Sequence, residues 1–447
     1  MLGLPFVLPA HGIGGRQDLP ISYTLAVYGS GAAVLVSILL LAVAWRRPLF
    51  QTRRVVTTLP SWLSRAILSR ATRIGVGVLG CVLTFGSIAC GAFGTFQAAD
   101  NFAPTYLYVL LWLGIVPLSL LFGPFYVWFN PARALHAALF RLAGLDPEDG
   151  VRPLPERVGI WPAVVGIFAY ATIELTLFDP SRPVLVAGFL FAVVLVSFVG
   201  GLLFGSDYFT SGDPFEAYSR TLSALSPWER EGNEIRVRNP LRGLATMPRP
   251  AGFTAFVCLL VGSTAFDGLS RTPKFYESTM FVQGKSWLVH DGFYMLCLIG
   301  VVVIFGVLFR LGVWAMSLIS GVQDAGRTRR FAHSILPIAL GYAIAHYFSL
   351  LVFQSEDVPR LLADPAGVGW HLLPTTRWKV DYTVLTPSVI SLTQVGGIVA
   401  GHILGVVTAH DTALAVLPER RRTLAQVPLA VVMVLITTTA VVILLNG

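Results

Sequence analysis

Long apolar runs recur along this chain, and they constrain its fold more than any other feature. About 20 consecutive apolar residues form a helix that crosses a bilayer core of about 30 Å. Only 13% of the 447 residues are charged, whereas soluble domains carry roughly 25%. The sequence therefore predicts an all-α, polytopic integral membrane bundle with a single transmembrane domain over residues 21–447. We predict about ten spans, at residues 21–45, 74–96, 105–129, 158–178, 183–204, 250–268, 292–318, 334–354, 385–409 and 427–445.

The basic residues between these runs predict the orientation of the chain. Of the 32 lysines and arginines, 24 are on one side, 23 of them in the loops after the first, third, fifth, seventh and ninth spans and one, Arg310, in the part of the seventh span nearest that side. Loops rich in lysine and arginine stay in the cytoplasm, so both termini are predicted outside and residues 1–20 form an extracytoplasmic segment. Because the net charge of +8 is concentrated at span ends, it indicates topology and not a nucleic-acid partner.

The N-terminal segment lacks the basic start and long apolar core of a signal peptide. We interpret it as an ordered loop that precedes the first span. An alternative remains open, in which cleavage after Ala10 makes His11 the first residue. Its free amine and imidazole could then chelate copper.

Three shorter segments are amphipathic and are predicted to be helices on the inner surface of the membrane, near residues 57–70, 130–145 and 213–228. Each places apolar side chains along one face, as interfacial helices do. The third begins with Asp213-Pro214, a capping residue followed by proline in the first helical position.

Polar side chains lie within or beside several predicted spans, mostly toward the outer side. Glu174 lies about one turn before the end of the fourth span, Asp267 closes the sixth, and His290-Asp291 precede the seventh. An ionisable group in a span faces a cavity or another helix, and it marks a functional site by default.

Two histidines lie deeper, one in the eighth span and one in the ninth. Tyr342, His346 and Ser349 share one helical stripe, and His402 follows Gly397 and Gly401, which allow another helix to approach. We predict that His346 and His402 line one outward-facing cavity with Glu174 near its mouth. The alternative is that each imidazole bonds a backbone carbonyl in a dry core. His410-Asp411 is interpreted as the cytoplasmic end of the ninth span.

These residue types suit a divalent metal such as zinc or copper. Neutral imidazole and carboxylate are its usual ligands, and the bound ion activates water. Glu174 and Asp267 are the candidate catalytic groups. The candidate metal ligands are His346, His402, His290, Asp291 and His11. Glu174 could instead pair with Arg182. Motifs for ATP hydrolysis, for thiol–disulfide exchange and for HExxH zinc proteases are absent from the sequence.

Four stretches together resemble one family: AHGIGGRQDLP (10–20), GDPFEAYSRTLSALSPW (212–228), AHYFSLLVFQ (345–354) and GHILGVVTAHD (401–411). They are similar to the bacterial polytopic membrane proteins, common in actinobacteria, that are labelled fenitrothion hydrolase. The resemblance runs from end to end of the chain. It implies a bacterial plasma-membrane protein that cleaves an organophosphate triester, and it supplies no catalytic residues. The clustered metal-ligand histidines of soluble phosphotriesterases have no counterpart here.

Three functions remain open from the sequence. The first is a membrane-embedded, metal-dependent hydrolase that acts on an apolar, organophosphate-type ester from the outer side. The second is a transporter, or a protein that handles a metal ion or a lipid without catalysis. The third is a scaffold or assembly subunit with other membrane proteins as partners. The expected ligands are therefore an apolar small molecule or a metal ion, within the lipid bilayer.

Overall fold

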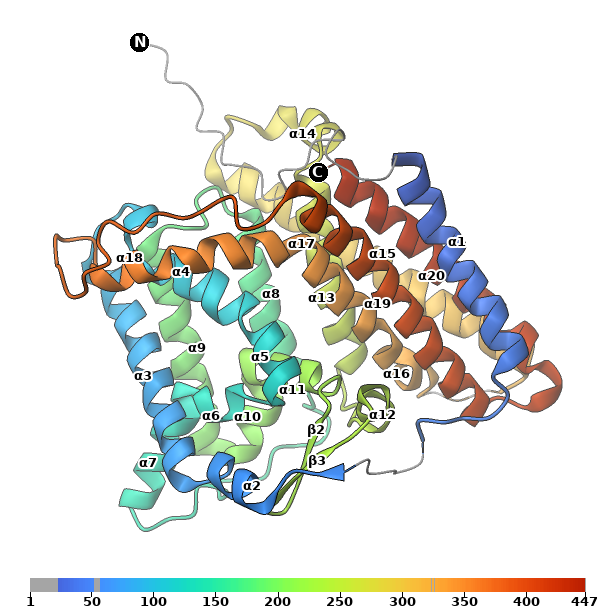
Figure 1. Cartoon of the computed structure of the whole chain (residues 1–447), viewed down its shortest axis with the longest axis horizontal. Helices are drawn as coiled ribbons and strands as arrows, with labels where there is room; N and C mark the ends of the chain where they lie inside the picture. The colour runs from blue at the N-terminus through green and yellow to red at the C-terminus, as the bar shows by residue number, and fades with distance from the viewer. Residues whose placement is uncertain (1–22, 52–56, 323, 325, 447) are drawn as a thin grey trace.

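The structure is a computed structural model that describes residues 23–51, 57–322, 324 and 326–446, and it is a helical bundle (Figure 1). The helices are α1 (Tyr23–Ala44), α2 (Ser61–Ile67), α3 (Arg70–Phe93), α4 (Phe102–Thr105), α5 (Ile115–Phe122), α6 (Tyr126–Phe129), α7 (Pro131–Leu142), α8 (Trp161–Thr176), α9 (Pro183–Phe204), α10 (Ser206–Gly212), α11 (Pro214–Ser223), α12 (Pro240–Thr246), α13 (Phe253–Ser270), α14 (Pro273–Ser278), α15 (Trp287–Ser320), α16 (Arg327–Ala332), α17 (Leu336–Glu356), α18 (Val358–Ala363), α19 (Pro387–Val416) and α20 (Arg422–Asn446). A π-helical stretch, Tyr106–Leu113, joins α4 to α5.

The helices agree with an all-α membrane bundle. Eight helical segments of the described chain are long and apolar enough to cross a membrane, and two shorter apolar helices, Val27–Leu41 and Trp161–Thr176, lie in the remaining predicted spans. Some boundaries differ by several residues, as in the ninth predicted span, where α19 continues beyond residue 409 to Val416. The last seven residues of α19 include the polar side chains of His410, Asp411 and Thr412, followed by four apolar residues, so hydropathy alone does not locate the end of the helix.

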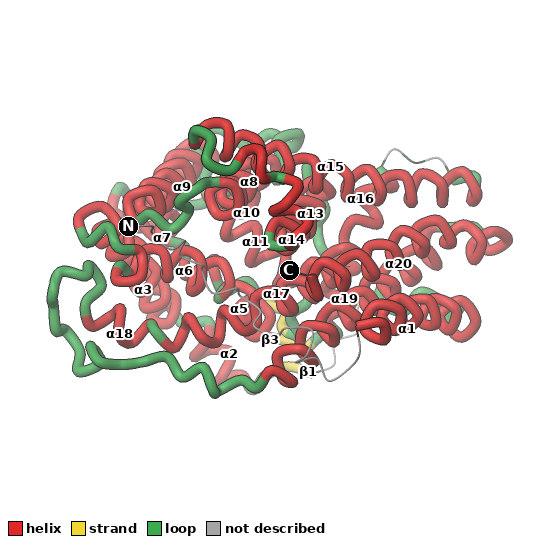
Figure 2. The backbone as a smooth tube through the Cα atoms, turned by 90° about the horizontal axis from the view of Figure 1, so that it is seen from above, coloured by secondary structure: helices red, strands yellow, loops and turns green. Residues whose placement is uncertain are grey.

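The helices form two groups with a pair of helices between them. Figures 1 and 2 show α3 and α6–α10 on one side, and α1, α15, α16, α19 and α20 on the other. The helices α13 and α17 lie between the groups, where α13 contacts α8 and α15, and α17 contacts α19 and the π-helical stretch. Side chains on α13 and α17 can therefore meet residues from both groups.

Glycines bring α17 and α19 into close contact, as the sequence predicts. A Cβ added at Gly341 would lie 2.3 Å from the Gly397 carbonyl oxygen, and one at Gly401 would lie 2.5 Å from the Pro337 carbonyl oxygen. Both distances are too short for any side chain. The space at these glycines is therefore filled by the backbone of the facing helix, and they do not open a groove beside His402.

A small antiparallel sheet with the order β1-β3-β2 lies at one end of the bundle, made of β1 (Thr57–Thr58), β2 (Trp228–Glu231) and β3 (Glu234–Val237). Thr57 pairs with Val237, and Trp228 pairs with the same residue from the other side. The predicted helix near 57–70 is therefore wrong at its start, where a strand precedes α2. Two residues of strand carry too little periodicity to be seen in a sequence.

The predicted surface helix near 213–228 is instead buried. All residues of α11 except Arg220 are buried. Its amphipathic pattern is real, but its polar face meets polar partners from other helices and not the membrane surface. Amphipathicity alone does not distinguish these environments, because both require one polar face and one apolar face.

His410 and Asp411 do not mark the end of α19, and their side chains form hydrogen bonds to the segment that follows α1. The His410 imidazole contacts the Gln426 side chain at 2.7 Å and the Trp45 carbonyl oxygen at 3.0 Å. The Asp411 carboxylate accepts from the backbone N–H groups of Leu49 and Phe50. Since the pair bonds several residues of this segment, it has a structural role within α19 and, contrary to the sequence prediction, does not mark the end of the span.

Candidate functional site

The Asp267 carboxylate, in the last turn of α13, is the centre of a buried polar cluster. Its Oδ2 atom lies 2.9 Å from His346 Nε2 and accepts a hydrogen bond of 2.9 Å from the Tyr347 hydroxyl. Its Oδ1 atom accepts from Arg271 Nε at 2.8 Å. Asp267 itself is 2% exposed. A buried carboxylate needs such partners, because an unpaired charge in the interior is costly.

Local helix geometry places the partners of Asp267. Arg271 is four residues further along the chain, one turn away at the end of α13, where an i,i+4 ion pair is favourable. His346 and Tyr347 are neighbours on α17, and their rings meet edge to face with centroids 4.7 Å apart. Successive residues of a helix point about 100° apart, so the two side chains reach the same carboxylate oxygen from different sides.

Glu174 from α8 adds a second carboxylate to this cluster. It lies within electrostatic range of Asp267 and Arg271. Tyr170, one turn earlier on α8, faces Glu174 and is 1% exposed. We call Glu174, Asp267, Arg271, His346 and Tyr347 the Asp267 cluster. It contains two acids, one arginine and one histidine, contributed by three helices.

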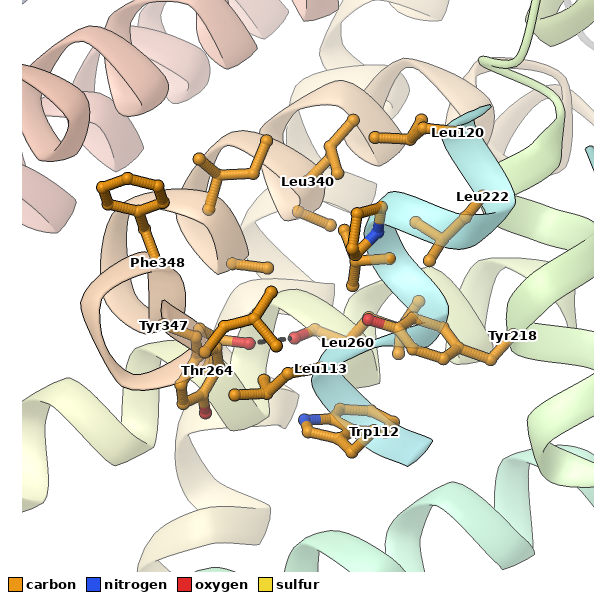
Figure 3. Close-up of a pocket in the computed structure, with 16 residues that line it drawn as sticks. Trp112, Leu113, Leu120, Tyr218, Leu222, Leu260, Thr264, Leu340, Tyr347 and Phe348 are labelled. Carbon is orange, nitrogen blue, oxygen red and sulfur yellow. Dashed lines mark hydrogen bonds between the residues drawn. The ribbon is translucent and has the colours of Figure 1, made fainter. Parts of the chain in front are cut away.

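An apolar cavity of about 160 Å³ adjoins this cluster (Figure 3). Tyr347 lines it and is at the same time bonded to Asp267. Tyr218, on the opposite wall, stacks on Trp112 with centroids 4.6 Å apart. Most other lining side chains are aliphatic or aromatic, from α5, α11, α13 and α17, among them Val116, Leu120, Leu222, Leu260, Leu340 and Phe348.

Few polar atoms are free inside the cavity. Thr264 lines it, but its hydroxyl donates to the Leu260 carbonyl of its own helix at 2.9 Å. The Tyr347 hydroxyl is committed to Asp267. An apolar cavity with a polar group at one edge is the usual form of a small-molecule site, and it favours an apolar ligand with one polar end.

On the other face of α17, the Tyr342 ring stacks on His346 at 6.1 Å, as their shared stripe predicts. The Tyr342 hydroxyl is buried, and it has no hydrogen-bond partner among the described residues. A Cβ at Gly268 would lie 2.9 Å from this hydroxyl. The hydroxyl is therefore held beside the residue that follows Asp267.

The predicted site residues thus divide into two sets. Asp267 and His346 are in contact, and Glu174 is close to them. His402 is 0% exposed, and its Nδ1 atom bonds the Ile398 carbonyl oxygen at 2.8 Å, which is the alternative interpretation considered for it. Its Nε2 atom has no partner in the part of the chain that the structure describes.

The remaining predicted ligands do not join the cluster through any hydrogen bond or ion pair of the described residues. His290 Nδ1 lies 2.9 Å from Asp291 Oδ1, and the imidazole stacks on Tyr294 with centroids 4.5 Å apart. His11 lies outside the described residues.

The described residues contain no group of three or more His, Cys, Asp or Glu side chains that could hold a metal ion. In the Asp267 cluster, His346 Nε2 is already directed at the carboxylate. Of the five predicted metal ligands, the four that the structure describes are therefore not gathered around one point, and His11 lies outside the described residues.

Sequence reasoning missed Arg271 and Tyr347. The i,i+4 spacing from Asp267 to Arg271 was a usable signal for an ion pair. Tyr347 carried no such signal, because its role depends on how α17 packs against α13.

Sequence reasoning also missed a second buried carboxylate, Glu216 on α11, which is 0% exposed. The Arg133 guanidinium from α7 donates two hydrogen bonds to the Glu216 carboxylate, of 2.9 and 2.7 Å, and Arg220 donates one of 3.0 Å. Asn130 donates to Glu216 at 3.2 Å. Asp213 caps α11 by accepting from the Glu216 backbone N–H. We call these five residues the Glu216 cluster.

Comparisons of the chain with protein-family models, with curated proteins and with solved structures give no match. The functional argument therefore depends on the Asp267 cluster and on the cavity beside it.

Proposed function

We propose that this protein is a membrane-embedded hydrolase of an apolar, organophosphate-type ester, with the cavity beside α17 as its substrate site. The observation that carries the proposal is the position of Tyr347. Its ring forms part of an apolar wall, and its hydroxyl shares the Asp267 carboxylate oxygen with His346. A substrate in the cavity would therefore have its polar end beside a histidine–carboxylate pair.

The volume of the cavity limits the part of the substrate that enters. An engineered protein cavity of about 150 Å³ binds benzene, and the cavity here is about 160 Å³. One aromatic ring of an aryl ester would fill it. The phosphoryl group would then lie at the polar edge, near Tyr347.

The Asp267 cluster supplies groups for acid–base catalysis. Asp267 accepts three hydrogen bonds, so its main role is to stay ionised and stabilise a positive charge on His346. In the proposed reaction, a water molecule attacks phosphorus while His346 Nδ1, the imidazole nitrogen that is not bonded to Asp267, takes its proton. The bond from phosphorus to the aryl oxygen breaks, and the proton returns from His346 Nδ1 to the leaving phenoxide.

The test is release of the phenol from a chromogenic aryl dialkyl phosphate by the purified protein in nanodiscs. Asp267→Asn should reduce turnover by about 10²–10⁴-fold, the usual size of a general acid–base contribution. Asp291→Asn is the matched control, because Asp291 contacts His290, and it should keep the wild-type rate. Equal rates for the two variants would refute the assignment.

A second candidate function is proton-coupled movement of an apolar molecule through the bilayer. The observation that favours it is Glu174 beside Asp267, because chains of acidic and histidine residues between spans are found in proton-driven pumps and transporters. This function predicts proton uptake or release when an apolar ligand binds, without any phenol product. The hydrolase predicts product.

We further propose that the chain makes ten spans with both termini outside, in the bacterial plasma membrane. The support is the arginine asymmetry together with the ten apolar helices. Single cysteines replacing two exposed residues, Glu277 before α15 and Asn233 between β2 and β3, test this in intact cells. A membrane-impermeant maleimide should label position 277 and spare position 233, and the reverse pattern would invert the topology.

A further inference from the structure

The end of the bundle that carries the small sheet holds several arginines with few acidic partners. Arg238 follows β3, Arg242 lies on α12, Arg249 precedes α13, and Arg330 lies on α16. We call these four residues the arginine cluster. It is separate from the Asp267 cluster and from the cavity beside α17.

Arg242 is the least expected member of this cluster. It is only 7% exposed, yet no ion pair or side-chain hydrogen bond of Arg242 is formed with the described residues. Arg242 is close enough to Arg238 for its charge to lower the pKa of that second cation. A cation that is largely covered by protein and has no acidic partner leaves a positive charge for an anion to balance.

Glycine brings the cations Arg238 and Arg242 together. A Cβ at Gly243, beside Arg242, would lie 2.4 Å from the Arg238 Cζ atom. The Arg238 guanidinium therefore packs directly against α12. It donates to the Ser223 carbonyl at 3.0 Å and the Ser226 carbonyl at 3.3 Å. These contacts fix its position but do not neutralise its charge.

Arg249 also lacks a full set of partners. One of its Nη atoms donates to the Ala245 carbonyl at the end of α12, but its buried Nε atom has no partner among the residues placed by the structure. Burial, and then the nearby charge of Arg330, lower the pKa of Arg249. Burial and the charge of Arg242 likewise lower the pKa of Arg238.

The acids paired with the cluster balance half of its charge. Glu229 lies 4.0 Å from Arg238, and Asp324 lies 2.9 Å from Arg330. Against four arginines, these two carboxylates leave about two positive charges. An anion with several oxygen acceptors would satisfy them, and arginine forks bind phosphate groups well.

We propose that the arginine cluster binds a phosphate-type anion, presented as the headgroup of an anionic phospholipid. The position favours a lipid, because α12 contacts α19 and α16 contacts α13, so the cluster lies beside membrane-spanning helices. The topology proposed above puts this end on the cytoplasmic side, where basic pockets between spans bind anionic headgroups. This inference does not depend on the proposed hydrolysis.

The test measures thermal unfolding of the full chain in nanodiscs of three kinds. They contain phosphatidylcholine alone, phosphatidylcholine mixed with phosphatidylglycerol, or phosphatidylcholine with added inorganic phosphate at matched ionic strength. A ligand that binds only the folded state raises Tm. We expect phosphatidylglycerol to raise the wild-type Tm by about 2–4 °C, the shift that a modest stabilisation produces in a chain of moderate size. We expect inorganic phosphate to raise it less.

Two variants locate the effect. Arg242→Gln should abolish the phosphatidylglycerol shift, and in phosphatidylcholine alone it should be at least as stable as wild type, because it removes one of two adjacent positive charges. Arg141→Gln, at an exposed arginine of α7 on the same predicted side, is the control and should keep the full shift.

Each outcome decides the proposal. No wild-type shift with phosphatidylglycerol, or an undiminished shift in Arg242→Gln, would overturn it. An equal shift with inorganic phosphate would keep the anion site but replace the lipid by a free phosphate. The wild-type measurements are decisive by themselves if Arg242→Gln does not fold.

Discussion

The Asp267 and Glu216 clusters surround their buried carboxylates with different cations. Each contains two acids, but the cations differ. Glu216 pairs with Arg133 and Arg220 and has Asp213 beside it, whereas Asp267 pairs with Arg271 and His346 and has Glu174 beside it. Arginine keeps its charge at every pH that a cell meets, but histidine can gain or lose a proton near neutrality. The Glu216 cluster therefore has only arginines as cations, whereas the Asp267 cluster also contains a histidine.

The two clusters also differ in what surrounds them. Glu216 is bonded by two guanidinium groups and an amide and ties α7 to α11. The Asp267 cluster has a cavity along one side, and near the other is the Tyr342 hydroxyl, which no described residue bonds. Buried ion pairs alone are weak evidence for function. The cavity and the histidine make the Asp267 cluster the better candidate for chemistry.

The largest expected effect is a difference in the stability lost when the central carboxylate of each cluster is replaced. Glu216→Gln should destabilise the fold by about 3–5 kcal/mol, because it leaves the Arg133 charge uncompensated in the interior. Asp267→Asn should cost less, about 1–3 kcal/mol, because Arg271 is 41% exposed and can turn to solvent. Thermal unfolding in one detergent measures both, and a larger loss for Asp267→Asn would remove the distinction between the clusters.

This contrast also shows what could be predicted from the sequence. The positions of the apolar helices and the close approach at Gly397 and Gly401 follow from local patterns. Asp267 and His346 were both identified as candidates, but His346 was matched with His402, because depth along a helix says little about which way a side chain points. The pairing with Asp267 depends on the packing of α13 against α17, which no single segment encodes.

The burial of α11 has a similar explanation. Its sequence shows one polar and one apolar face, which predicts a helix at the membrane surface. The partner of its polar face, Arg133, lies 83 residues earlier than Glu216, and no local pattern connects them. Long-range ion pairs of this kind become visible only when the fold places the helices together.

The second prediction concerns the helix that carries His346 and Tyr347. Gly401→Ala should cost about 1–3 kcal/mol, the usual result of overpacking, because the new methyl group would lie 2.5 Å from the Pro337 carbonyl oxygen. Gly396→Ala is the matched control, since nothing lies within 4 Å of its Cβ position. Gly401→Ala should also reduce activity that depends on the Asp267 cluster. Equal stability of the two variants would mean that α17 and α19 do not cross at these glycines.

The last prediction looks for a titrating group within the otherwise fixed Glu216 cluster. Burial, and then the charge of Glu216, raise the pKa of Asp213 to about 6 from its ordinary value of 3.8. The folded state therefore binds this proton more tightly than the unfolded state. Stability contributed by Asp213 is then greatest below about pH 4, falls as the pH rises toward 6, and stays level above that. Asp213→Asn cannot ionise, and its amide oxygen can still cap α11, so the variant should lack this decline. The difference in Tm between wild type and Asp213→Asn, measured from pH 4 to 7, isolates the contribution from those of other acids. The difference should grow in favour of the variant as the pH rises. Parallel curves would show that Asp213 is ionised throughout, and the Glu216 cluster would then carry only fixed charges.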